Sequence, residues 1–101
     1  MREFMRGAVR LHILYHASID EVHGAWLSDE LARHDYRISP GSLYPILHKM
    51  EAERLLRSRT TVSEGRRRRC YLATAKGVRT LARAKQQLRE LADEILGTDG
   101  S

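Results

Sequence analysis

The sequence predicts a mainly α-helical domain with one small β-hairpin, and three observations lead to this fold class. Apolar residues recur at helical spacing in residues 3–17, in residues 25–34, after residue 42 and after residue 74. Alternating residues over 55–62 and 68–73, on either side of Ser63-Glu64-Gly65, indicate two strands joined by a turn. At 101 residues, the chain has the size of one structural domain.

The first two helices form the beginning of the predicted core. Residues 3–17 carry a broad apolar face made by Met5, Ala8, Leu11 and Tyr15. The stretch from Leu11 to Tyr15 is apolar nearly all round, which predicts burial against the core and against a second chain. A polar connection, 18–24, then leads to the helix over 25–34, whose inward pair is Leu27 and Leu31.

The third helix has two competing starts. With Ser39 as the N-cap, Pro40 takes the favoured first position, but Pro45 then lies inside the helix at a cost. With Ser42 as the N-cap, Pro45 falls in the first turn, where its missing N–H has no partner to lose. We therefore expect a start at 42 or 43. The inward residues are Leu43, Ile46, Leu47 and Met50, and the outer ones are Ser42, Tyr44, Pro45, His48 and Lys49.

The hairpin and the last helix complete the domain. Ile38, in the connector before the third helix, is a candidate single strand residue paired with the hairpin. Thr74 caps a helix that runs to about Leu96 and stops at Gly97. Its apolar residues have the spacing of a helix–helix seam. We expect dimerisation through Leu11, Leu81, Ala84, Leu88, Leu91 and Ile95, so that 74–97 is a dimerisation helix that follows the rest of the domain, 1–73.

The net charge of +5 is unevenly distributed along the chain. Residues 49–89 contain 13 lysines and arginines and three acidic residues, whereas the other 60 residues contain five arginines and ten acidic residues. A strongly basic segment joined to an acidic remainder is typical of a protein that binds a polyanion. Four consecutive arginines, Arg66 to Arg69, lie at the predicted hairpin.

Three helices, a hairpin and a long helix follow one another in the order of a winged helix-turn-helix with a C-terminal extension, so we expect 1–73 to be a winged-helix DNA-binding domain. In that fold the third helix enters the DNA major groove, and the N–H groups at a helix N-terminus can bind a phosphate. Alternation along a strand predicts that two of the four arginines face a groove. A solvated surface is the competing interpretation. The candidate DNA-binding residues are Ser39, Gly41, Ser42, Tyr44, His48, Lys49, Arg66, Arg67, Arg68 and Arg69.

Residue patterns for other functions are missing. The sequence has no nucleophile motif and no phosphate-cradling glycine loop, so we expect no enzyme activity and no cofactor. His12 and His16 are four residues apart, but nothing in that helix completes a metal site. Cys70 is interpreted as a half-buried strand residue, with a redox-sensing thiol as the alternative. Without a membrane-length apolar run or a signal peptide, we expect a cytoplasmic protein, at the nucleoid when bound to DNA.

Several segments resemble the PadR-type transcriptional regulators. Residues 39–47, SPGSLYPIL, resemble the family signature S-x-G-[ST]-L-Y-P-x-L, and residues 50–53 resemble the L-E-x-E that follows it. Arg67 to Tyr71 resembles the wing strand R-[RK]-x-Y, residues 74–77 match T-x-K-G, and His23-Gly24 resembles the H-G that opens the second helix. The likeness covers roughly residues 8 to 85.

The resemblance implies a bacterial or archaeal homodimeric repressor, with Ser42 and Tyr44 touching DNA and Arg66 to Arg69 in the wing. The chain departs from the family pattern at two positions. Arg54 replaces the usual glycine after L-E-x-E, so we expect a left-handed non-glycine residue there, at about 1 kcal/mol. The aromatic that follows H-G is displaced to Trp26, a candidate for ligand stacking whose alternative is a core or interface role.

The function expected from the sequence is therefore transcription regulation. We expect a homodimer that represses at a palindromic double-stranded DNA operator and is released by a small-molecule inducer. A protein-interaction adaptor or a non-specific nucleic-acid-binding protein is the alternative.

Overall fold

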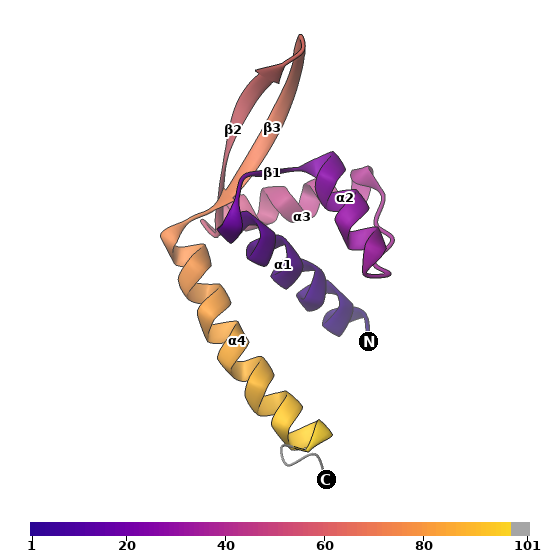
Figure 1. Ribbon diagram of the computed structural model, residues 1–101, viewed down its shortest axis with the longest axis vertical. Helices are drawn as coiled ribbons and strands as arrows, with labels where there is room; N and C mark the ends of the chain where they lie inside the picture. The colour runs from indigo at the N-terminus through magenta and orange to yellow at the C-terminus, as the bar shows by residue number, and fades with distance from the viewer. Residues whose placement is uncertain (98–101) are drawn as a thin grey trace.

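The computed structural model describes residues 1–97, which form four helices and a three-stranded antiparallel sheet (Figure 1). The elements are α1 (Arg2–Ile19), β1 (Val22–His23), α2 (Gly24–Arg33), α3 (Pro40–Ala52), β2 (Leu56–Ser63), β3 (Arg66–Ala73) and α4 (Ala75–Leu96). The β2–β3 hairpin projects from one end and α4 extends toward the other, so the molecule measures 55 × 28 × 21 Å (Figure 1). The mainly helical fold with a small hairpin is the one predicted.

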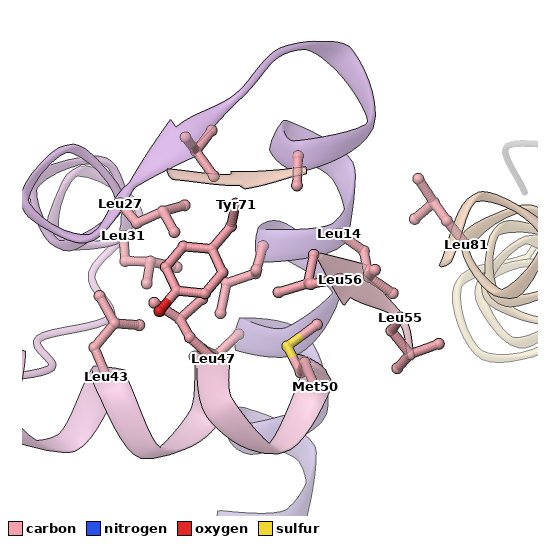
Figure 2. Packing of buried hydrophobic residues seen from close by; sticks show 14 residues of the cluster. Leu14, Leu27, Leu31, Leu43, Leu47, Met50, Leu55, Leu56, Tyr71 and Leu81 are labelled. Atoms are coloured by element: carbon pink, nitrogen blue, oxygen red, sulfur yellow. The ribbon is translucent and has the colours of Figure 1, made fainter. Parts of the chain in front are cut away.

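The core lies between α1, α2, α3 and one face of the sheet. Tyr71 of β3 is fully buried among leucines of α2 and α3 (Figure 2). Leu43, Leu47 and Met50 of α3 are buried as predicted, whereas Ile46 is partly buried at the edge of the cluster. Because these α3 residues hold the helix against the sheet, the opposite face of α3 is left to solvent.

The third strand of the sheet is not where the sequence placed it. The sheet order is β1-β3-β2, and Val22 of β1 lies opposite Tyr71 of β3. The prediction of Ile38 as the strand residue is wrong, because Ile38 packs against the core from the connection before α3. Val22 is buried at 6% exposure, but the acidic residues beside it made the segment look like a polar connection.

The β2–β3 hairpin, called the wing below, is longer at its tip than predicted. Leu56 lies opposite Ala73, and the pairing continues without interruption to Ser63 opposite Arg66. A two-residue turn joins the strands at Glu64 and Gly65, which have φ values of 53° and 75°. Both residues are left-handed, as the tightest hairpin turns require, so all four arginines of the run belong to β3.

The start of α3 at residue 42 or 43 was wrong. Ser39 is the N-cap, its hydroxyl accepts from the Ser42 N–H at 3.3 Å, and Pro40 occupies the first turn. Pro45 lies inside the helix. The Ser39 carbonyl also accepts from the Leu43 N–H at 2.9 Å. The hydroxyl cap and the pre-set φ of Pro40 together offset the missing hydrogen bond at Pro45.

Two features join α3 to the wing and the wing to α4. Arg54 follows α3 with φ 64°, so the left-handed arginine is confirmed. Thr74 caps α4 by accepting from the Gly77 N–H at 3.0 Å, also as predicted. A β-carbon at Gly77 would lie 2.2 Å from the Leu55 carbonyl oxygen, so only glycine allows α4 to pass this close to the start of β2.

Candidate nucleic-acid interface

The outer face of α3 and its N-terminus carry all six predicted residues of this segment in exposed positions. They are Ser39, Gly41, Ser42, Tyr44, His48 and Lys49. The Ser42 N–H already donates a hydrogen bond to the Ser39 hydroxyl, and Pro40 has no N–H to donate. The Gly41 N–H is in the first turn, where amides lack intrahelical acceptors. The Gly41 N–H at this end of α3 is therefore suited to donate a hydrogen bond to a phosphate oxygen.

Tyr44 is held at the junction between α3 and α2. A β-carbon at Gly24, the first residue of α2, would lie 2.9 Å from the Tyr44 hydroxyl oxygen. Tyr44 is still 42% exposed, and its ring centroid lies 6.5 Å from that of His48. Gly24 thus makes room for the Tyr44 ring, a role that the sequence analysis did not predict.

The four wing arginines are all exposed and alternate between the two faces of the sheet. Arg67 and Arg69 share a face with Tyr71, which is the face packed on the helices, because residues two apart in a strand point the same way. Arg66 and Arg68 lie on the opposite face, called the outer face below. The structure therefore brings two arginines to the side of the sheet that α3 occupies.

The outer face holds further basic residues that the sequence reasoning did not single out. Arg57 and Arg59 of β2 alternate onto it, and the Arg59 guanidinium donates to the Glu21 carboxylate, with Nη2 to Oε1 at 2.7 Å. This hydrogen bond and the charge of Arg59 hold the pKa of Glu21 below its ordinary value. The signal in the sequence was the R-x-R spacing, which places both side chains on one strand face.

His23 connects the start of α2 to the outer face. Its Nδ1 accepts from the Trp26 N–H at 3.4 Å, and its Nε2 lies 3.1 Å from Arg68 Nη1. A neutral imidazole has one acceptor nitrogen, so the two contacts cannot both be hydrogen bonds at once. The imidazole can therefore accept from either Trp26 or Arg68, and its tautomer decides which.

Comparison with known proteins identifies the family. A model of the transcriptional regulator PadR-like family matches residues 13–83, which include α3 and the wing. The chain belongs to the PadR-like family of transcriptional regulators. It is 59% identical over 97 residues to the transcriptional regulator Rv3488 of Mycobacterium tuberculosis, a match that covers 96% of this chain and 91% of that protein.

Solved structures of PadR regulators share the fold. A PadR-like regulator from Bacillus cereus superposes with a TM-score of 0.79 at 31% identity, covering 96% of this chain and 99% of the other. A PadR regulator from Eggerthella lenta gives a TM-score of 0.80 at 28% identity, covering 92% and 82%. The resemblance read from the motifs is therefore confirmed, and the chain is a transcriptional regulator with the fold of a DNA-binding protein.

The seam predicted for dimerisation lines an open apolar groove in this PadR-family chain. The groove, called the α1–α4 groove below, has a volume of about 610 Å³. Five of the six predicted residues line it, namely Leu11, Leu81, Ala84, Leu88 and Leu91. Leu88 and Leu91 are 47% and 48% exposed, and Ile95, 69% exposed, lies further along α4. Figure 1 shows α4 running beside α1 in the opposite direction and extending past its N-terminus.

Trp26 lies apart from the α1–α4 groove, on the exposed side of α2. It is 41% exposed, and its ring meets His16 edge-on with centroids 5.1 Å apart. His16 and His34 both approach the Glu30 carboxylate, at 3.5 Å and 3.1 Å. Trp26 therefore packs on a histidine–glutamate cluster rather than in the core.

His12 completes this cluster, with its ring 4.8 Å from that of His34. Burial lowers the pKa of His12, and the neighbouring His34 and His16 lower it further. Within residues 1–97, however, no set of three or more histidine, cysteine or carboxylate side chains is arranged to hold a metal ion.

Cys70 is half-buried on the outer face, with its sulfur 3.5 Å from the Thr61 hydroxyl oxygen.

None of the described helices combines the length and apolar character needed to cross a membrane.

Proposed function

We propose that this PadR-family chain binds DNA sequence-specifically through α3 and the wing, and that it represses transcription as a homodimer at an inverted-repeat operator. One observation carries the proposal. The exposed polar face of α3 and two wing arginines, Arg67 and Arg69, lie on the same side of the sheet. Such a surface offers base-reading groups and phosphate-binding groups together.

In this proposal the two parts have different tasks. The N-terminal half of α3 enters the major groove, where Ser42 and His48 reach base edges and Tyr44 donates to a phosphate. The wing arginines neutralise backbone phosphates, and each such contact steepens the dependence of affinity on salt by roughly 0.9 in log–log slope. Specificity thus comes from α3 and much of the affinity comes from the wing.

A second copy of the chain is the proposed occupant of the α1–α4 groove. The exposed leucines of α4 continue the groove in one stripe, and a two-fold axis would let each α4 cover the other subunit's stripe. Residues 1–73 would then be the DNA-binding part and 74–97 the dimerisation helix. Such a dimer presents two α3 helices to half-sites about 34–36 Å apart.

Repression would follow from occlusion of a promoter, in the cytoplasm and at the nucleoid. A small molecule that changes the spacing of the two α3 helices would release the DNA. Trp26 is the candidate stacking residue for such a ligand because its ring is half-exposed.

Selection of bound sites from random double-stranded DNA tests the proposal. We expect an enriched motif with two-fold symmetry and half-sites about one helical turn apart. Binding without sequence preference at every salt concentration would leave only a non-specific nucleic-acid binder. An absence of DNA binding would instead favour the adaptor.

A further inference from the structure

A chain of hydrogen bonds joins three elements on the side of the wing that faces α3. Arg69 Nη1 of β3 donates to Ser58 Oγ of β2 at 3.1 Å. Ser58 Oγ in turn donates to Glu51 Oε2 of α3 at 2.6 Å. The directions are compatible, because a hydroxyl has one proton to give and two lone pairs to receive. We call Glu51, Ser58 and Arg69 the relay.

The two inner members of the relay are fixed by the core. Glu51 follows Met50, which is fully buried, and Ser58 lies opposite Tyr71, which is also fully buried. Both Glu51 and Ser58 are half-buried, whereas Arg69 is exposed. The mobile end of the relay is therefore the guanidinium, and its anchor is a carboxylate in the last turn of α3.

The guanidinium is only partly engaged by this contact. Arg69 and Glu51 are joined through the Ser58 hydroxyl, so a neutral group stands between the two charges. The bond to Ser58 uses one of the five N–H donors of an arginine. The remaining donors stay available for a phosphate.

We propose that Ser58, anchored by Glu51, is a positioning residue that holds Arg69 beside α3 before DNA binds. This inference rests on the proposed function, in which Arg69 contacts DNA. A long side chain on a projecting hairpin samples many rotamers, and restricting them in advance lowers the entropic cost of binding. The relay also fixes the wing relative to α3, the element that reads the bases.

A double-mutant cycle on DNA affinity tests the inference, with a labelled mixed-sequence duplex as the probe. Ser58→Ala should weaken binding about 3- to 10-fold when Arg69 is present, the effect of one lost hydrogen-bonded constraint. In the Arg69→Ala background it should have no effect, because the two residues act as one unit. Ser58→Thr keeps the hydroxyl and should retain the affinity. Ser63→Ala, the same substitution in the same strand but on its opposite face, is the matched control.

The outcomes separate this inference from the proposed function. If Arg69→Ala weakens binding and Ser58→Ala does not, or if Ser58→Ala costs the same in both backgrounds, the positioning role is wrong and the DNA contact stands. If Arg69→Ala leaves affinity unchanged, the proposed wing contact itself fails. Melting temperatures of all variants show whether any loss of affinity reflects unfolding.

Glu51→Ala tests the anchor independently. Removing a carboxylate near DNA should, by charge alone, tighten binding. The relay predicts weaker binding instead, because Ser58 loses its acceptor. Unchanged or tighter binding would show that Glu51 does not anchor the relay.

Discussion

Replacing Gly77 with alanine should destabilise the protein by forcing α4 away from the start of β2. The new β-carbon would lie 2.2 Å from the Leu55 carbonyl oxygen and 3.3 Å from Leu14 Cδ2. The same carbonyl accepts from the Thr74 N–H at 3.0 Å, so it cannot move without straining that hydrogen bond. Overpacking of this kind costs about 1–3 kcal/mol, and a weakened hydrogen bond about 1 kcal/mol. The higher helix propensity of alanine stabilises α4 by about 1 kcal/mol and offsets part of this cost.

The net expectation is a loss of about 2 kcal/mol, which lowers the melting temperature by about 8–16 °C for a domain of this size. Thermal unfolding followed by circular dichroism, at one fixed protein concentration, measures it. Gly7→Ala is the matched control, because a β-carbon at Gly7 meets nothing within 4 Å and should stabilise α1 by about 1 kcal/mol. A Gly77→Ala variant that melts at or above the wild-type temperature would refute the close-approach argument.

Three further predictions follow from the buried groups and the groove. Tyr71→Phe should leave the free energy of unfolding unchanged or raise it by up to about 1 kcal/mol in urea titrations, because the Tyr71 hydroxyl is buried with no hydrogen-bond partner among residues 1–97. Burial lowers the pKa of His12 below its ordinary 6.5, so its contribution to stability is complete above about pH 6.5 and is lost as the pH falls through the folded-state pKa. His12→Gln should reduce the loss of stability between about pH 7 and pH 5. Leu91→Glu should shift sedimentation from dimer to monomer, whereas Gln86→Glu, a residue that does not line the groove, should not.

The sequence predicted which helices and hairpin strands exist better than it predicted where each of them begins and ends. Periodicity located each of the four helices and both hairpin strands, because their buried residues repeat with clear spacing. It failed for β1, whose two residues are too few to show a period and pair with a strand nearly 50 residues away. It also failed at Pro45, where a local cost was outweighed by the Ser39 cap and Pro40 at the helix start.

The candidate site shows the same division between local and long-range information. The exposure of Tyr44 and the alternation of the wing arginines follow from helix and strand geometry alone. The contacts that set their positions do not, because Gly24 meets Tyr44 and Glu51 meets Ser58 only after the chain has folded. No spacing within a single element would have indicated either contact.

The central claim is that α3 and two wing arginines, Arg67 and Arg69, form one DNA-binding surface. Its most direct test is the affinity of Arg67→Ala/Arg69→Ala for the selected operator over a range of salt concentrations. The control is Arg83→Ala/Arg89→Ala, which removes the same charge from exposed positions on α4. We predict that the wing variant loses affinity and that its log–log salt slope falls by roughly 0.9 per lost contact, while the control keeps the wild-type slope. Equal losses in both variants, or no loss in the wing variant, would contradict the claim.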